Sequence, residues 1–385
     1  MRSNFQKMDK NLLFWTTLMF IFGLFMIFSA SSVEASLTGV PYYYFIRQSV
    51  ILIICAVISI VVTNIPLKIY KRFAFIFTLI IIASLVIVYL YGAIINRAKS
   101  WIPLGFFNYQ PSEFAKTVII LYMAVYYNKN KDSDKPIVVF FPVIIAAIMV
   151  ALTFIQPDFG TAFIIAGITG ILFLSIPISK QSKQSIIKLG ALIGVIVLMF
   201  LLATGKSLLS KGQLDRLDYR RPCAKYLSGG SGYQVCNGFI AINNGGLWGV
   251  GLGNSTQKYL YLPEAHTDFI MAIILEELGL IIGVFIIIIY AVILMSIIRI
   301  AHHSYNLMGS VIAYGTAIYI FLHIVINLTG LLGLLPLTGV PLPFLSYGGS
   351  YALNLSILLA LVQRVEIENK KKKQERLLKE GKRAY

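Results

Sequence analysis

The sequence predicts an all-α polytopic membrane protein with about ten transmembrane helices, both termini in the cytoplasm and one large extracytoplasmic loop between helices 7 and 8. The composition is the first reason, because 58% of the residues are hydrophobic and 13% are charged, whereas about a quarter are charged in a soluble domain. The second reason is that apolar runs of about 20 residues, the length that crosses a bilayer, recur along the chain.

These runs define the domain organisation. A cytoplasmic N-tail (1–11) precedes a single membrane domain (12–363), which includes the outer loop 205–267, and a basic C-tail (364–385) follows. The predicted spans cover residues 12–30, 45–63, 73–91, 110–127, 136–154, 160–178, 187–204, 268–298, 307–328 and 345–363.

The positions of Lys and Arg are the third reason, because they orient the chain. Most of the 33 basic residues fall on one side of the membrane when ten spans are counted, which is the positive-inside pattern. Contact with anionic lipid explains the net charge of +17, so we expect no nucleic-acid partner. The inner basic positions are Arg2, Lys7, Lys10, Lys68, Lys71, Arg72, Lys129, Lys131, Lys135, Lys180, Lys183, Lys188 and Arg299, together with those from Arg364 to Arg383.

The outer loop 205–267 is rich in Gly, Tyr and basic residues, and a loop of this length in a compact protein is usually functional or disordered. An amphipathic stretch at 235–242 predicts a short interfacial helix within it. Three cysteines are too few for a disulfide framework or a zinc site. Cys223 and Cys236 share this loop, and the sequence leaves open whether they form a disulfide.

Acidic residues within the spans mark either function or a satisfied pair. Glu113 and Lys116 in "QPSEFAK" are three residues apart on one helix, so a mutual ion pair is the plain alternative to substrate binding. Asp158 in "QPDFGTA" follows a proline, and capping of the next helix is its plain alternative.

The stretch "YLPEAHTDFIMAIILEELG" places Glu264, His266 and Asp268 at the outer end of a span. A partly desolvated carboxylate there suits general-base work on a hydroxyl, because desolvation raises its pKa. A helix cap formed by Thr267 or Asp268 would explain the same residues without chemistry. Glu276 and Glu277 lie roughly 12 Å further along the predicted helix, so we expect them to bond the backbone or a neighbouring span.

The segment "LPLTGVPLPFLSYGGS" has three prolines and three glycines within 335–350, so it cannot form a regular span. We expect a re-entrant or broken segment that lines a cavity, where irregular backbone is tolerated at membrane depth. A groove between this segment and spans four, five and eight would suit a lipid tail.

Five blocks of the sequence resemble the FtsW/RodA (SEDS) family of bacterial cell-wall polymerases. They are "GLFMIFSASS" at the end of span one, "SWIPLGFFNYQPSEFAK" at 100–116, "QPDFGTA" at 156–162, "GYQVCNGFIAINNGGLWGVGLGNSTQKYLYLPEAHTDF" at 232–269 and "GVPLPFLSYGGS" at 339–350. The resemblance covers nearly the whole chain between the charged tails. The block around "HTDF" is more similar to the FtsW branch, which acts in division and sporulation, than to the RodA branch, which acts in elongation.

This resemblance implies a peptidoglycan glycosyltransferase in the plasma membrane of a bacterium. Its substrate would be lipid II, a disaccharide-pentapeptide on undecaprenyl pyrophosphate, and Asp268 would be the catalytic base of an inverting transfer. A class B penicillin-binding protein, a transpeptidase, is the implied partner, alongside other division or elongation proteins and membrane lipids. No cofactor is certain, and a divalent cation, Mg or Mn, could share the neutralisation of the pyrophosphate.

Further residues are candidates for substrate binding. A pyrophosphate leaving group calls for cations, and the basic residues on the correct side are Lys116, Arg216, Arg220, Arg221 and Lys258; Arg220 and Arg221 serve equally well as interfacial anchors. Trp101 suits a sugar face, with a membrane-belt anchor as its alternative. The full predicted set is Asp268 as the catalytic residue, with Trp101, Glu113, Lys116, Asp158, Arg220, Arg221, Lys258, Glu264, His266 and Ser346 in substrate binding; whether a metal site exists is unknown.

Two positions depart from the family pattern, because Arg97 and Tyr351 stand where small residues are usual. A lipid II flippase is the rival function, since transporters also need broken helices and intramembrane charges. A scaffold that only recruits a partner would tolerate changes at every acid named above. The enzyme is favoured because the ionisable groups concentrate at the outer mouth.

Overall fold

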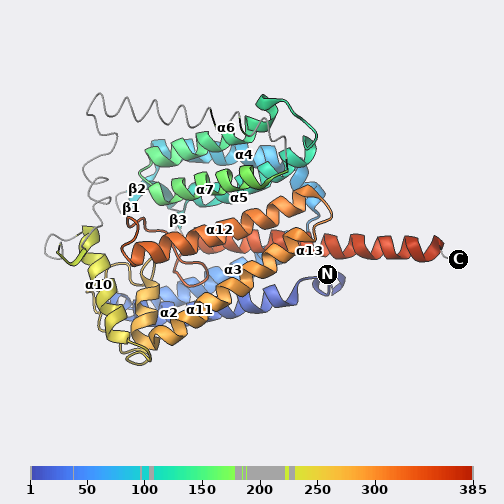
Figure 1. Ribbon diagram of the computed structural model, residues 1–385. Helices are drawn as coiled ribbons and strands as arrows, with labels where there is room; N and C mark the ends of the chain where they lie inside the picture. Colours follow the sequence, from blue (N-terminus) through green and yellow to red (C-terminus); the bar gives the residue numbers. More distant parts are fainter. Residues whose placement is uncertain are drawn as a thin grey trace.

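The computed structural model describes residues 2–37, 39–95, 98–103, 108–177, 184, 188, 222–224 and 230–383. Long helices lie side by side in a bundle, with both termini at one end and the strands and α10 at the other (Figure 1). The helices are α1 (Arg2–Phe5), α2 (Lys10–Leu37), α3 (Tyr43–Asn64), α4 (Leu67–Tyr91), α5 (Pro111–Lys129), α6 (Pro136–Ile155), α7 (Phe159–Ser175), α10 (Gly230–Gly245), α11 (Ile270–His302), α12 (Leu307–Leu331) and α13 (Gly349–Arg383).

The all-α membrane architecture is confirmed. Within the described residues, seven helices are long and apolar enough to cross a membrane, namely α2, α3, α4, α6, α11, α12 and α13. Helix α7 is apolar but shorter, and α5 is buried along most of its length, so it needs no lipid-facing surface. Each predicted span except 187–204, which lies outside the described residues apart from Lys188, corresponds to a helix.

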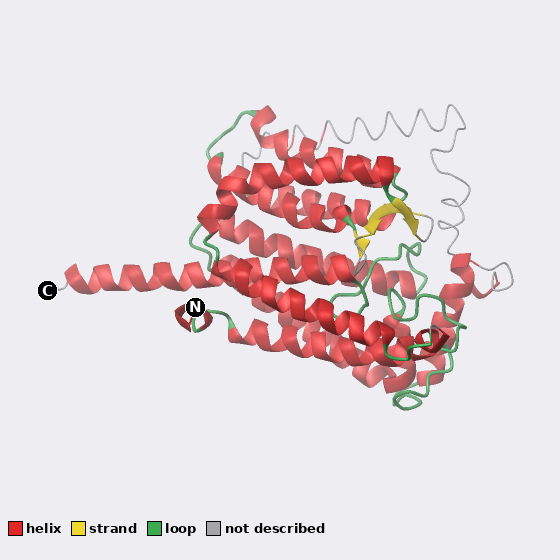
Figure 2. Cartoon of the chain, turned by 180° about the vertical axis from the view of Figure 1, so that it is seen from behind, coloured by secondary structure: helices red, strands yellow, loops and turns green. Residues whose placement is uncertain are grey.

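One short antiparallel sheet departs from the all-α prediction. Its strands β1 (Ala93–Ile95), β2 (Ala98–Pro103) and β3 (Asn108–Tyr109) occur in the order β1-β2-β3 between α4 and α5. Figure 2 shows the strands at the end of the bundle away from the termini, where most of the longer loops also gather. Trp101 lies in β2 and pairs with Ala93.

The predicted span over 268–298 corresponds to α11, which is interrupted at one residue. Helix α11 breaks at Gly279, where φ is 81° and ψ is 174°, a conformation that residues with a Cβ avoid. A Cβ at Gly279 would also collide with the carbonyl oxygen of Leu247. The chain therefore forms a short helix over 270–278, which carries Glu276 and Glu277, and a long helix over 280–302.

The segment between α12 and α13 confirms the prediction of irregular backbone. Residues 332–348 form turns and extended stretches, and they are inserted among helices. Phe344 packs its backbone against Gly23 of α2, and the hydroxyl of Tyr290 in α11 donates to the carbonyl oxygen of Pro343. The predicted lipid-tail groove beside this segment stays a prediction.

The two ends of the bundle differ in a way that bears on orientation. Cys223 and Cys236 form a disulfide that joins residues 222–224 to α10, which resolves the alternative that the sequence left open. Disulfides persist in oxidising compartments, so this bond favours the predicted extracytoplasmic placement of that end. At the other end α13 continues as a helix to Arg383 and extends beyond the bundle (Figure 1), well past the predicted end of the span at 363.

Candidate active site

Asp268 lies at the junction between the outer loop and α11. The N-cap of α11 is Phe269, which makes no side-chain capping bond, so the alternative in which Thr267 or Asp268 caps this helix is wrong. Asn327 of α12 fixes the local backbone, because its Nδ2 donates to the carbonyl oxygens of Asp268 at 2.7 Å and Val340 at 2.8 Å. Asp268 is therefore held between α12 and the irregular segment.

The Asp268 carboxyl shares a hydroxyl with Glu264. Thr267 Oγ1 lies 2.8 Å from Glu264 Oε2 and 3.1 Å from Asp268 Oδ1. One hydroxyl has one hydrogen, so it can donate to one of the two carboxylates at a time. Burial, followed by repulsion from the Glu264 carboxylate, raises the pKa of Asp268 to about 7, and the Thr267 bond opposes this rise.

The side chain of Asp268 stays half-buried and faces the irregular segment. A Cβ at Gly339 would lie 3.9 Å from its Oδ2, which is ordinary contact. Glu264 forms the turn that precedes it, with a left-handed φ of 56°, and the amides of Thr267 and Phe269 donate to its carbonyl oxygen. The arrangement gives a carboxyl that titrates near neutrality and is open on one side.

His266 contacts side chains of α2 and α3. Its Nδ1 lies 3.3 Å from Glu34 Oε2, and Tyr44 donates to Glu34 Oε1 at 2.8 Å. The imidazole packs against the rings of Tyr44 and Tyr347, which also contact each other. Sequence reasoning missed Glu34, Tyr44 and Tyr347, although Glu34 carried a signal, because it is an acid at the outer end of the first span.

Asp158 caps α7, which the sequence suggested as the alternative to a role in substrate binding. Its side chain accepts from the amide of Thr161 at 3.3 Å, from Gln110 Nε2 at 2.8 Å and from Ser112 Oγ at 3.1 Å. Two residues on, Gly160 packs so closely on Thr338 that a Cβ would collide with the Thr338 carbonyl oxygen. The start of α7 thus contacts the same irregular segment that Asp268 faces.

Glu113 and Lys116 form the mutual ion pair that their spacing predicted, at 2.7 Å and with both side chains almost completely buried. Lys116 Nζ also lies 3.2 Å from His323 Nε2, and His323 Nδ1 lies 3.1 Å from the carbonyl oxygen of Pro341. Because the ammonium can only donate, Nδ1 carries the imidazole proton and donates to Pro341. Tyr351, the departure from the family pattern, is buried and packs on the His323 ring.

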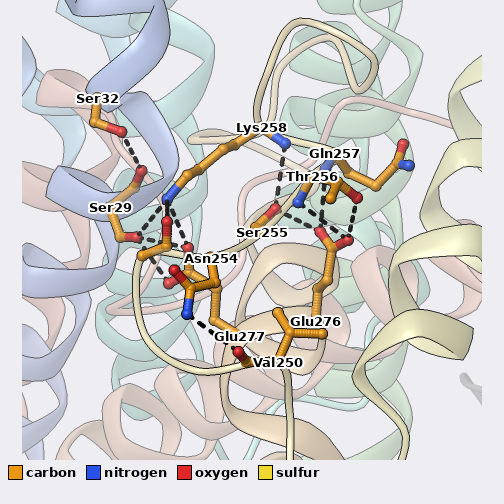
Figure 3. A network of polar contacts seen from close by, with 11 residues as sticks. Ser29, Ser32, Val250, Asn254, Ser255, Thr256, Gln257, Lys258, Glu276 and Glu277 are labelled. Atoms are coloured by element: carbon orange, nitrogen blue, oxygen red, sulfur yellow. Dashed lines mark hydrogen bonds and ion pairs between the residues drawn. The ribbon is translucent and has the colours of Figure 1, made fainter.

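Lys258 is enclosed rather than open to a substrate (Figure 3). Its ammonium pairs with Glu277 Oε1 at 3.0 Å and donates to the carbonyl oxygen of Gly253. Ser29 Oγ of α2 lies 2.7 Å from both oxygens of Glu277, so its hydroxyl donates to this carboxylate. These contacts use the charges of Lys258 and Glu277 to join α2, the outer loop and α11.

The carboxylate of Glu276 likewise binds the outer loop to α11. It accepts from the hydroxyls of Ser255 and Thr256 and from the backbone amide of Gln257 (Figure 3). It also accepts from the side-chain amide of Asn244 in α10. Glu276 and Glu277 therefore bond the loop backbone and a neighbouring helix, as the sequence predicted for them.

The other predicted site residues, where the structure describes them, form no hydrogen bond or ion pair with Asp268; the rest lie outside the described residues. Ser346 is buried, and its Oγ accepts from the amide of Leu342, which closes a local turn. Trp101 is half-exposed in β2. Arg216, Arg220, Arg221 and Arg97 lie outside the described residues. Among the residues that the structure describes, no cluster of three or more His, Cys, Asp or Glu side chains is placed to hold a metal ion.

The comparison with known families decides the assignment. The pattern that defines the FtsW/RodA/SpoVE family, described as cell cycle proteins, matches residues 9–371. The chain belongs to this family. It is 36% identical over 383 residues to the protein named probable peptidoglycan glycosyltransferase FtsW in Bacillus subtilis (strain 168). The aligned region covers 97% of this chain and 95% of that protein. A protein of the same name in Coxiella burnetii is 36% identical over 358 residues, which cover 90% of this chain and 92% of that protein.

Solved structures share the FtsW/RodA/SpoVE fold. A chain from a peptidoglycan synthase complex, studied for its structural coordination of polymerization and crosslinking, superposes with a TM-score of 0.73 at 22% identity and covers 94% of this chain and 98% of that chain. The crystal structure of the rod shape determining protein RodA from Thermus thermophilus gives a TM-score of 0.68 at 21% identity. The superposition covers 94% of this chain and 97% of the RodA chain. The chain is therefore a multi-pass bacterial membrane protein.

Proposed function

We propose that this FtsW/RodA/SpoVE protein is a peptidoglycan glycosyltransferase that polymerises lipid II at the outer face of the plasma membrane, in cell division. The observation that carries the proposal is the Asp268 carboxyl, which is half-buried beside Glu264 and has a pKa raised to about 7. A general base works best when its pKa is near the working pH. The most similar relatives named above are FtsW proteins, which supports the division role.

In the proposed reaction, ionised Asp268 removes the proton from the C4 hydroxyl of the acceptor's N-acetylglucosamine. That oxygen attacks C1 of the donor's N-acetylmuramic acid, the bond from C1 to the pyrophosphate oxygen breaks, and undecaprenyl pyrophosphate leaves with the bonding electron pair. A single displacement inverts the anomeric centre from α to β. Both substrates are lipid-anchored, so their sugars reach a base at the edge of the bilayer, which is where Asp268 lies.

The charges available for the leaving group differ from those that the sequence alone suggested. Lys116 and Lys258 are buried and paired with Glu113 and Glu277, so they stabilise the irregular segment and the outer loop. We therefore assign the pyrophosphate to the arginines of the outer loop, Arg216, Arg220 and Arg221, with a divalent ion, Mg or Mn, as a further counter-charge. Trp101 remains a candidate for stacking on a sugar.

Glu264, His266, Asp158 and Ser346 take supporting parts in this proposal. Glu264 keeps the pKa of Asp268 high, and His266 ties the turn to Glu34 of α2. Asp158 and Ser346 hold the irregular segment and the start of α7 in place. The partner that we propose is a class B penicillin-binding transpeptidase, in keeping with the peptidoglycan synthase complex among the structural neighbours.

The test is polymerisation of purified lipid II by the full chain in detergent, with and without the co-purified transpeptidase. Asp268→Asn should lower the rate of glycan formation by about 10²–10⁴. The matched control is Asp132→Asn, because Asp132 is exposed in the connection between α5 and α6 at the opposite end of the bundle, and it should retain the wild-type rate. Equal polymer from wild type and a folded Asp268→Asn protein would remove Asp268 from the mechanism. Absence of polymer from the wild type, even with the transpeptidase, would favour the flippase.

A further inference from the structure

We propose that the outer loop inserts four apolar side chains into the outer leaflet of the membrane. These side chains, called the loop patch, belong to Leu247, Trp248, Val250 and Leu252. Their occupant is lipid at the level of the headgroups and upper acyl chains. The proposal is independent of the chemistry at Asp268, and its evidence lies in the exposure, the backbone bonding and the position of this loop.

The loop patch is unusually exposed for its composition. Trp248 is 81% exposed, Leu252 67% and Leu247 59%. The surrounding stretch of sequence, residues 226–257, contains no Asp, Glu, Lys or Arg, so it lacks the charges that normally solvate a loop in water. A contiguous apolar surface of this kind marks an interaction site, and Trp is the residue most typical of the membrane–water interface.

Several backbone amides and carbonyl oxygens of the loop are already hydrogen-bonded to α11, which lowers the cost of placing them in an apolar environment. The amides of Val250 and Gly251 donate to the carbonyl oxygens of Glu276 and Glu277, at 2.9 and 3.0 Å. In return, Gly246 and Leu247 accept from the two amides that follow the break in α11, at 3.0 and 3.3 Å. Unsatisfied backbone groups exclude most loops from lipid, and this reciprocal pairing removes much of that obstacle.

The loop patch is continuous with a surface that already faces lipid. Immediately after the break, α11 exposes Leu280, Ile281, Val284 and Phe285, and this helix is one of the candidate membrane spans. The pairing described above places the loop beside the first of these residues. Figure 1 shows α10 and the beginning of α11 at the end of the bundle opposite the termini and on its outer edge, as an interfacial position requires.

The polar contacts of the loop lie on the side that faces the protein. Glu276 binds Ser255 and Thr256 and reaches Asn244 of α10, and the Lys258–Glu277 pair joins the loop to α2 (Figure 3). The loop is thus amphipathic, because buried polar bonds fix one side and apolar side chains project from the other. A lipid surface accommodates such a projection without a complementary protein groove.

Fluorescence of Trp248 in nanodiscs tests the proposal directly. The chain has three tryptophans, so Trp15→Phe with Trp101→Phe leaves Trp248 as the sole reporter in the full chain. Lipid carrying a nitroxide near the headgroup should reduce its emission about twofold or more, and aqueous iodide should have little effect, as for an interfacial tryptophan. Strong quenching by iodide without quenching by the nitroxide lipid would overturn the proposal.

A matched control uses the exposed Lys131 in the connection between α5 and α6. Lys131→Trp, with the three native tryptophans replaced by Phe, should be quenched by iodide and spared by the shallow nitroxide lipid. If Trp248 behaves like this control in the isolated chain and becomes protected only when the transpeptidase is added, the loop patch is a protein-docking surface and the lipid proposal is wrong.

A second variant tests the proposal without relying on tryptophan. Leu247→Ser with Leu252→Ser removes two apolar side chains and leaves the backbone pairing intact. In nanodiscs, hydrogen exchange at the amides of Leu280 and Ile281 should accelerate about tenfold, because the loop loses its anchor and opens more often. Unchanged exchange would show that the protein contacts alone hold the loop and would overturn the proposal.

Discussion

Two pairs of acidic residues lie close together in the sequence near the membrane, and their carboxylates differ in how far they are buried and hydrogen-bonded. Glu276 and Glu277 are fully buried, and each accepts several hydrogen bonds or an ammonium contact. Glu264 and Asp268 are half-buried and share the single hydroxyl of Thr267. The comparison teaches that satisfied carboxylates fix the fold, whereas the incompletely satisfied carboxyl of Asp268 is the one left poised to take a proton.

The largest effect on stability should come from breaking the buried Lys258–Glu277 ion pair. Lys258→Ala leaves Glu277 buried without its cation, and removal of one partner from a buried pair typically costs about 3–5 kcal/mol. The thermal unfolding transition in detergent should therefore fall sharply. Replacing both partners, Lys258→Met with Glu277→Gln, should restore much of the loss. A Lys258→Ala protein with an unchanged transition would show that Ser29 alone satisfies Glu277.

Removal of the Asp268 carboxylate, in contrast, should not lower the stability of the protein. The pKa of Asp268 is raised from 3.8 to about 7 on folding, so the wild type should lose stability as the pH rises through this interval, because the folded state holds the proton more tightly. Asp268→Asn has no such proton to lose. We expect its unfolding temperature to equal or exceed that of the wild type above pH 7, by differential scanning fluorimetry at several pH values. A large loss of stability at pH 8 would contradict this expectation.

The pH dependence of polymerisation should sharpen the comparison further. The proposed mechanism needs ionised Asp268, so kcat/KM should rise with pH through an apparent pKa near 7. Glu264→Gln removes the negative charge that raises this pKa, so the rising limb should move to lower pH. Glutamine can still accept from Thr267, which keeps the turn. A limb that stays in place, or that moves to higher pH, would exclude Glu264 as the source of the shift.

The smallest effect should come from the cap of α7. Asp158→Ala removes the cap bond to the Thr161 amide, whose loss costs about 1 kcal/mol, together with the bonds from Gln110 Nε2 and Ser112 Oγ. Asp158→Asn can keep the cap through Oδ1, but its Nδ2 cannot accept from Gln110 and Ser112, so its loss should be smaller than that of alanine by the contribution of the cap. The measurement is the unfolding transition of both variants beside the wild type. Equal losses in the two variants would show that the cap bond to Thr161 adds no measurable stability.

Local patterns in the sequence were sufficient for much of this protein. The spans could be predicted because an apolar run of bilayer length has few alternatives, and each described span is a helix. The Glu113–Lys116 pair and the Asp158 cap could be predicted because their partners lie three residues away. Asp268 was identified through the resemblance of its motif to a family, and its raised pKa follows the expected desolvation.

Only the tertiary structure decided the contacts between distant segments. The sequence predicts substrate binding for Lys258, but its pairing with Glu277 and the bond from Ser29 depend on α2 and the outer loop meeting at α11. The break at Gly279 arises because the loop backbone occupies the space that a continuous helix would need. The sequence by itself determined which segments cross the membrane and where a base would stand. The fold determined which charges are neutralised, because charge pairing depends on distance in space and these partners are remote along the chain.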